Sequence, residues 1–436
     1  MTKSGTQKIH SGGKWRVICL YAAIFTYFLS AYMFTPFLSL YVKELGGSYA
    51  EFAAVLSVTG LVLSLIQSYI GYLSDRIGAR FLVAGGGLIS AVGLLLIGIT
   101  YDKFWICVLY LLMNIGMGIL VPSVFTLISY QKTAKGNSFI PVYRSIQGAG
   151  VILGPIIGGW VMGISYRSNV FWGGAVMLVS IGLFALFFQG KEKQAGQSFE
   201  GHGRVKKAQR KGQEAGETET ELRGAGKEPG EMEEELREDE SKAEGKTVTF
   251  RQALGEVLHN KQFLVIMLLF TCIELSYDLI QMSLPIVGAE LNFGTDIIGT
   301  ALSAYFIMFT LFQIPINNGL KKLSVRKALM LMGGLALIPC ILLLLNLPSY
   351  AMIMIMGGVG LTIGSLFTFC SVLAAEESPE DKKGSFMGIF NTIMPFTDVV
   401  SPIMVAFLIG VNLKAPYVAA VVLVAVFIVL AGVKKA

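Results

Sequence analysis

The feature of this sequence that most restricts its fold is the recurrence, from end to end, of uncharged apolar stretches about 20 residues long. A helix of about 20 residues spans the roughly 30 Å hydrocarbon core of a bilayer. Strands of a membrane barrel would be about 10 residues long and would alternate in polarity, which these stretches do not. Composition agrees, because 54% of the 436 residues are hydrophobic and 15% are charged. We therefore predict an all-α membrane protein.

Twelve stretches, in two sets of six, have the length of a membrane-spanning helix. The first set lies at about 17–42, 52–74, 81–101, 104–130, 142–166 and 168–190. The second lies at about 262–289, 296–318, 327–346, 349–375, 384–410 and 414–433. The stretches at 327–346 and 349–375 are separated only by a turn signal at 346–349, which contains Pro348. The sequence predicts an N-terminal tail at 1–16 and two pseudo-symmetric six-helix bundles, at 17–190 and 251–433.

The segment at 191–250 joins the two bundles and differs sharply from them in composition. It is rich in Glu, Lys, Gly and Gln and has almost no large apolar residues, so it cannot bury enough surface to fold. We predict a disordered, charged linker. A short segment at 249–260 is expected to form an interfacial helix ahead of the seventh span.

Lysine and arginine are distributed unequally between the two sides of the predicted bundles. The short loops and tails on one side contain 17 of them, whereas the other side has only Lys43, Lys103, Arg167 and Lys414. Cytoplasmic loops are the ones enriched in these residues. The prediction is a multi-pass protein of the cell membrane, plasma or inner, with both termini and the linker in the cytoplasm.

Several classes of function find no support in the sequence. The five cysteines all fall inside apolar stretches without a C-x-x-C pair, and the three histidines lie outside the predicted spans. The net charge of +6 is scattered over short loops rather than gathered on a nucleic-acid-binding face. We therefore expect no metal, no cofactor, no nucleic-acid partner and no enzymatic activity, and we expect a monomer.

The loop after the second predicted helix resembles a motif of the major facilitator superfamily, G-x-x-x-D-R-x-G-[RK]-[RK]. The matching residues are Gly71, Asp75, Arg76, Gly78 and Arg80, and one basic position is lost to Ala79. In that family the loop closes the cytoplasmic side. The equivalent stretch at 318–327 repeats the basic residues without the acidic one, which supports an internal repeat.

The fifth predicted helix contains a full match to G-x-x-x-G-P-x-x-G-G, which resembles the antiporter motif of exporters in the same superfamily. The residues are Gly150, Gly154, Pro155, Gly158 and Gly159. Glycines four apart form a groove for a neighbouring helix, and the proline removes one backbone donor. Generic helix packing is the alternative reading, because a glycine groove does not encode a direction of transport.

One position departs from the pattern of drug exporters in this superfamily. Their fourth helix usually carries an arginine ahead of a glycine pair, but here Asn114 precedes Gly116 and Gly118. If that arginine takes part in proton coupling, this chain must couple through other residues or not at all.

Three acidic residues lie inside the predicted spans, namely Glu274, Asp278 and Asp398. Each charge costs about 2.5–3.5 kcal/mol at the membrane centre, so these side chains should be protonated or face a water-filled cavity. Glu274, Tyr277, Asp278 and Gln281 follow the spacing i, i+3, i+4 and i+7 and share one helical face. Hydrogen-bonded packing of the carboxyl groups is the alternative.

The resemblance to drug:proton antiporters covers the chain except for 191–250 and implies alternating access, with protons and a small molecule as partners. Its cavity would be lined by helices 1, 4, 7 and 10, and Glu274, Asp278 and Asp398 would couple protons. Substrate-binding candidates are Tyr32, Asn114, Glu274, Tyr277, Asp278 and Gln281. The middle of the predicted spans contains these acidic residues but no lysine or arginine, which favours a cationic or zwitterionic amphiphile as the substrate. Export of a specific metabolite (a sugar, a metallophore or a lipid precursor) and a non-transporting sensor remain alternatives.

Overall fold

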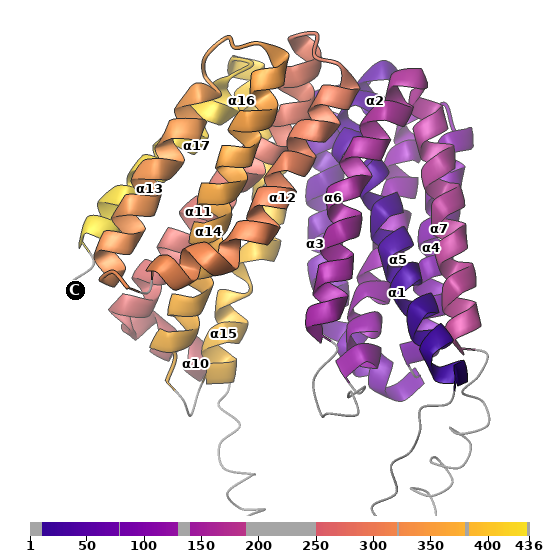
Figure 1. Cartoon of the computed structure of the whole chain (residues 1–436), viewed down its shortest axis with the longest axis horizontal. Helices are drawn as coiled ribbons and strands as arrows, with labels where there is room; N and C mark the ends of the chain where they lie inside the picture. Colours follow the sequence, from indigo (N-terminus) through magenta and orange to yellow (C-terminus); the bar gives the residue numbers. More distant parts are fainter. Residues whose placement is uncertain are drawn as a thin grey trace, which may run out of the picture. The chain divides into compact units, whose positions relative to one another are not determined.

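The computed structural model describes residues 11–77, 79–129, 140–188, 250–320, 322–379 and 383–433. The described secondary structure is helical throughout (Figure 1). Twelve helical segments within it are long and apolar enough to cross a membrane. The predicted all-α fold with two six-helix bundles is confirmed.

The first half contains eight helical elements. They are α1 (Ser11–Phe34), the 3-10 helix η1 (Thr35–Phe37), α2 (Leu38–Glu44), α3 (Tyr49–Ile77), α4 (Ala79–Ile99), α5 (Lys103–Ser129), α6 (Ile140–Ile164) and α7 (Tyr166–Phe188). The second half contains α11 (Lys261–Glu290), α12 (Thr295–Leu320), α13 (Val325–Leu342), α14 (Ser349–Glu377), α15 (Lys383–Phe390), α16 (Ile393–Val411) and α17 (Ala415–Val433). Both halves belong to one compact unit.

Residues Phe188–His259 form a second unit. Within it the structure describes α10 (Phe250–His259), a helix where the sequence predicts one. Its position at a membrane interface stays a prediction. The predicted disordered linker lies outside the described residues, apart from its last position.

Two spans that the sequence suggested were continuous helices are broken. The first span, Val17–Glu44, consists of α1, η1 and α2, and Pro36 lies in the first turn of the 3-10 helix. The eleventh, Phe386–Val411, is interrupted by a turn at Asn391 and Thr392, and Pro395 follows in the first turn of α16. Proline has no backbone N–H and suits the first turn of a helix, which accounts for a new helix starting at each place.

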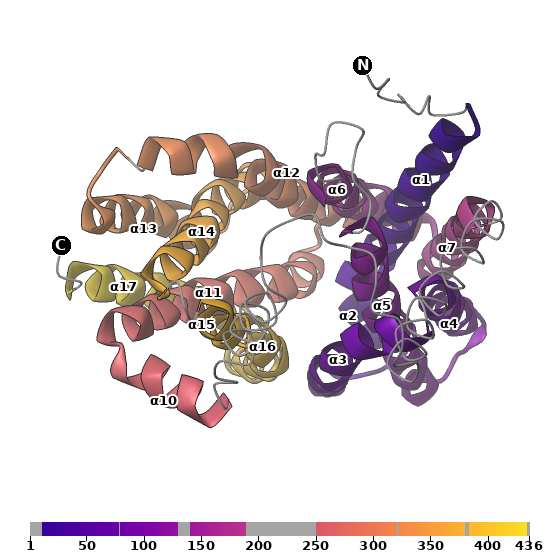
Figure 2. The ribbon, with the colours of Figure 1, turned by 90° about the horizontal axis from the view of Figure 1, so that it is seen from below.

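The contacts between helices follow the two-fold repeat of the chain. Within the halves, α4 packs on α5 and α13 packs on α14, which are helices 3–4 and 9–10 of the twelve. Between the halves, α3 packs on α16 and α6 packs on α12 (Figure 2). These are helices 2 with 11 and 5 with 8, and exchanging the halves converts one pair into the other. The core therefore has the symmetry of two parallel repeats.

The ends of helices 1 and 7 show the same repeat in backbone detail. Gly46 and Asn292 have φ values of 75° and 59°, and each follows a helix that ends at a glutamate and has a leucine as its C-cap. The next residue donates its N–H five positions back, from Gly47 to Val42 at 2.9 Å and from Phe293 to Gly288 at 2.8 Å. This is the Schellman ending of a helix, in which glycine or asparagine adopts the left-handed conformation.

Candidate functional site

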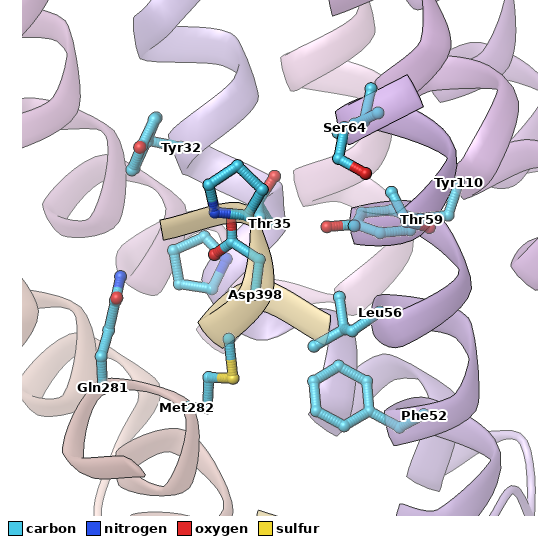
Figure 3. Close-up of a pocket in the computed structure, with 14 residues that line it drawn as sticks. Tyr32, Thr35, Phe52, Leu56, Thr59, Ser64, Tyr110, Gln281, Met282 and Asp398 are labelled. Atoms are coloured by element: carbon cyan, nitrogen blue, oxygen red, sulfur yellow. The ribbon is translucent and has the colours of Figure 1, made fainter. Parts of the chain in front are cut away.

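A cavity of about 260 Å³ lies where helix breaks of the two halves come together. It is lined by Tyr32, Thr35, Pro36, Phe52, Leu56, Thr59, Gly60, Leu63, Ser64, Tyr110, Gln281, Met282, Pro395 and Asp398 (Figure 3). Thr35 and Pro36 come from η1, and Pro395 and Asp398 come from the start of α16. Irregular backbone at membrane depth is tolerated where it lines a cavity, and transporters use broken helices to build binding sites.

The contact between α3 and α16 forms one wall of this cavity. Ser57 donates its hydroxyl to the carbonyl oxygen of Val399 at 2.7 Å. A methyl group on Gly60 would lie 3.2 Å from the carbonyl oxygen of Asp398, so the two backbones approach closely. The small residue at position 60 therefore allows α16 to present Asp398 beside α3.

Asp398 lies at the centre of the cavity, with Tyr32 and Gln281 on one side and Phe52, Leu56 and Thr59 on the other (Figure 3). Its side chain is exposed to the cavity, and among the described lining residues it alone carries a formal charge. The hydroxyl of Thr59 is buried and has no hydrogen-bond partner among the described residues. The cavity thus offers a carboxylate and aromatic rings, and its wall contains a buried hydroxyl without a partner among the described residues.

Glu274 and Asp278 are buried rather than exposed in this cavity. Their exposed fractions are 4% and 3%, and neither is among the residues that line it. One carboxyl oxygen of each, Oε2 of Glu274 and Oδ2 of Asp278, has no hydrogen-bond partner in the described structure. Both carboxyls interact electrostatically with Asp398. The acidic residues therefore form two layers, with Asp398 in the cavity and the α11 pair behind it.

The other predicted substrate-binding residues divide into two groups. Tyr32 and Gln281 line the cavity, and Tyr32 also contacts Phe306 edge-on with ring centres 5.8 Å apart. Tyr277 is stacked on Tyr305 at 4.9 Å and lies outside the lining. Asn114 is buried and donates from Nδ2 to the carbonyl oxygen of Tyr110 at 2.9 Å, on its own helix.

The lining differs from the predicted walls on helices 1, 4, 7 and 10. Helices 1, 4 and 7 supply six of its fourteen residues, helices 2 and 11, here α3 and α16, supply the other eight, and helix 10, here α14, contributes no residue among those described. Residues that sequence reasoning missed include Thr35, Thr59 and Tyr110. The available signals were the prolines at 36 and 395, which mark helix breaks, and the hydroxyl-bearing residues of the second helix.

The antiporter motif packs against two different helices. A methyl group on Gly154 would lie 2.6 Å from Cβ of Tyr32, and one on Gly158 would lie 2.8 Å from Cα of Met33, both on α1. Gly150 faces α1 in the same way, at Phe28 and Leu29. The adjacent face, with Pro155 and Gly159, meets α12 of the second half, where Thr295 donates to the Gly159 carbonyl oxygen at 2.8 Å.

The loop motif after helix 2 is only partly described. The backbone from Gly71 through Asp75 and Arg76 is helical and belongs to α3, which ends at Ile77. Gly78 lies outside the described residues, as do the side chains from 71 to 77. Arg80 is in the first turn of α4. The latch function of this motif stays a prediction.

The sequence profile of the Major Facilitator Superfamily matches residues 20–286 and 266–434, which together cover nearly all of the chain. The chain belongs to the Major Facilitator Superfamily. As a superfamily member it shares its fold with the nucleoside transporter NupG, at a TM-score of 0.68 and 15% identity over 95% of this chain and 97% of that one. A bacterial homologue of the human lysosomal transporter Spinster aligns at a TM-score of 0.61 and 13% identity, over 98% of this chain and 96% of that one.

Curated relatives of this superfamily member include two resistance proteins. The quinolone resistance protein NorA of Staphylococcus aureus (strain MRSA252) is 24% identical over 190 residues, 42% of this chain and 48% of that protein. The multi-drug resistance efflux pump PmrA homolog of Lactococcus lactis is 29% identical over 152 residues, 34% of this chain and 38% of that protein. The chain thus spans half or less of the length of these relatives. Among the described residues, no group of three His, Cys, Asp or Glu side chains could hold a metal ion.

Proposed function

We propose that this transporter exports a small cationic or zwitterionic amphiphile by proton-coupled alternating access. The observation that carries the proposal is the single charged side chain of the described cavity lining, Asp398, surrounded by the rings of Tyr32, Phe52 and Tyr110. A carboxylate attracts a cation, and aromatic faces bind the same cation through their negative π-clouds. The names of both curated relatives, one a quinolone resistance protein and the other a multidrug efflux pump homologue, agree with export.

Glu274 and Asp278 supply a basis for coupling in this proposal. One oxygen of each carboxyl has no hydrogen-bond partner among the described residues, and a buried charge without full compensation is costly, so in this proposal these groups hold protons unless a cation or water reaches them. Arrival of a cation at Asp398 changes the charge that both of them experience. A cation at Asp398 disfavours protons on the buried pair, so substrate binding and proton binding oppose each other, and exchange follows without a separate coupling element.

The contacts between the halves agree with one state of an alternating-access cycle. At the end away from the predicted cytoplasmic loops, Lys43 on α2 pairs with Glu290 on α11, and Tyr49 donates to Glu290 at 2.8 Å. A further cavity runs from Leu61 on α3 to Asn391 near the helix 11 break. In the proposed topology, with both termini in the cytoplasm, these contacts hold the two halves together at the extracellular end. The substrate would then enter the cavity from the cytoplasm, as export requires.

One observation favours the second candidate, a specific metabolite exporter. A buried hydroxyl without a partner, such as that of Thr59, discriminates in favour of a ligand that satisfies it. The cavity of about 260 Å³ also suits a small molecule. A sugar or another polar metabolite with several hydroxyl groups would use Thr59 more than Asp398.

The test is transport into proteoliposomes with an imposed pH gradient, using matched cationic, zwitterionic and neutral amphiphiles together with sugars. The wild type should concentrate cations, and Asp398→Asn should lower their apparent affinity about tenfold or more, the value of one charge-assisted contact. Glu376→Gln, which removes an exposed carboxylate outside the cavity, serves as the control. Equal transport of cations by wild type and Asp398→Asn would exclude the proposed site, whereas transport of sugars alone would establish the second candidate.

A further inference from the structure

A second cavity, of about 350 Å³, lies between α2, α3 and α5, and it shares no lining residue with the first. Its walls are two stripes of residues, one on each of two helices. Within each stripe the spacing is i, i+3, i+4 and i+7, which places the residues on one face of the helix. They are Glu51, Ala54, Val55 and Val58 on α3, and Phe104, Cys107, Val108 and Leu111 on α5. Val58 is 50% exposed and Phe104 is 66% exposed. The cavity is therefore an apolar groove on the surface of the first half.

One end of this groove is polar. Glu51 Oε1 and Lys103 Nζ form an ion pair at 2.7 Å, each with somewhat under half of its side chain exposed. Both residues belong to the first turn of their helices, so the apolar stripes run from the pair into the depth of the membrane spans. Tyr101 and Trp105 beside them are 74% and 55% exposed. Exposed tyrosine and tryptophan next to a lysine are typical of the membrane–water interface.

We propose that this groove binds a phospholipid whose zwitterionic headgroup carries a primary ammonium, as in phosphatidylethanolamine. One acyl chain lies along the stripes, the phosphate contacts Lys103 and the ammonium contacts Glu51. The groove opens onto a span that faces hydrocarbon, so a bilayer lipid is the occupant that meets it at high concentration. The proposal is independent of the transported substrate.

Charge complementarity selects this headgroup among the common ones. An anionic glycerol headgroup would satisfy Lys103 but would leave Glu51 facing a phosphate. A choline headgroup carries a positive charge but has no N–H to donate to a carboxylate. Only the primary ammonium gives each member of the pair a charge-assisted hydrogen bond.

The experiment is native mass spectrometry of the full chain in detergent, with phosphatidylethanolamine, phosphatidylcholine or phosphatidylglycerol of identical acyl chains. The wild type should retain the ethanolamine lipid about tenfold more than the choline lipid, the factor expected for one charge-assisted hydrogen bond. Val58→Trp should fill the groove and remove this retention. Val179→Trp is the matched control, because Val179 on α7 is 56% exposed and lies outside the cavity.

Two further variants separate a lipid site from a simple link between helices. Glu51→Gln should equalise the choline and ethanolamine lipids. The exchange of Lys103→Glu with Glu51→Lys should re-form an ion pair between the two helices, yet it should not restore the preference, because the phosphate is attached nearer to the acyl chains than the ammonium. Equal retention of all three lipids by the wild type, or unchanged retention by Val58→Trp, would overturn the proposal.

Discussion

Gly158 lies on the face of α6 that packs against α1, and replacing it by alanine tests how tight that contact is. The new methyl carbon would lie 2.8 Å from Cα of Met33 and nearer still to its carbonyl oxygen. Carbon atoms in favourable contact are about 3.5–4.0 Å apart, so α1 would have to move by about 1 Å. Backbone atoms cannot rotate away as a side chain can. Overpacking of this kind costs about 1–3 kcal/mol, which exceeds the gain of up to about 1 kcal/mol from the helix propensity of alanine.

Gly148, on the same helix, is the matched control. Its nearest neighbour for an added methyl is Cγ2 of Thr310 at 3.8 Å, an ordinary contact. Thermal unfolding of the purified protein in detergent should therefore show a lower midpoint for Gly158→Ala and an unchanged or slightly higher one for Gly148→Ala. Equal midpoints for the two variants would refute the tight α1–α6 contact.

Gly159 extends the same test to the contact between the halves. An added methyl would meet the backbone of Thr295 and approach Cα of Asp296 at 3.3 Å, both on α12. Gly159→Ala should therefore favour the state in which α6 and α12 part, with little loss of fold. The measurement is alkylation of a Ser303→Cys variant in a cysteine-free background, since Ser303 is buried and bonded to the Ile152 carbonyl oxygen. Faster alkylation with Gly159→Ala than with Gly148→Ala is expected, and equal rates would contradict it.

Three further predictions concern a turn, the linker and the acidic pair. Asn292→Val should lower the unfolding midpoint by placing a β-branched residue at a φ of 59°, at a cost of about 1–2 kcal/mol, whereas Asn292→Gly should not. Deletion of about 195–240 should leave the folded yield and the thermal midpoint nearly unchanged, because the composition of that stretch predicts a tether. Glu274→Gln and Asp278→Asn should each weaken accumulation driven by a pH gradient, measured in proteoliposomes. If the pH dependence of transport is unchanged in both variants, Asp398 becomes the candidate residue for proton coupling.

The fold could be predicted from the sequence because membrane spans depend on local composition. Twelve apolar stretches of the right length, with few charges, leave a bilayer helix as the one structure that satisfies the backbone. The breaks within helices 1 and 11 were not predicted, although Pro36 and Pro395 are visible in the sequence. A proline inside a membrane span is compatible with a kink or a break, and which of the two forms depends on partners that the neighbouring helices supply.

The candidate site could be predicted only in part, for a reason that concerns helical faces. Periodicity shows that Glu274 and Asp278 share a face, but it does not show what that face meets. Helix α11 is packed on several sides, by α14, α16 and α17 among others, so a polar face can point into the protein as well as into a cavity. On the predicted helix 11 Asp398 has a weaker pattern, with Asn391 seven residues earlier as a polar partner on the same face, and the turn before α16 and the close approach of Gly60 bring it into the cavity.

This arrangement separates two roles that the sequence could not distinguish. A carboxylate that lines the cavity can meet a substrate directly, and its loss should affect the binding of cations more than that of neutral molecules. In the proposed mechanism the buried carboxyls one layer behind respond to the charge in the cavity and exchange protons, so their loss should change the pH dependence more than the affinity. Comparing Asp398→Asn with Glu274→Gln in one assay therefore distinguishes the layers. If the two variants alter affinity and pH dependence to the same extent, the three carboxyls act as one titrating cluster, and the division into a binding residue and a coupling pair does not hold.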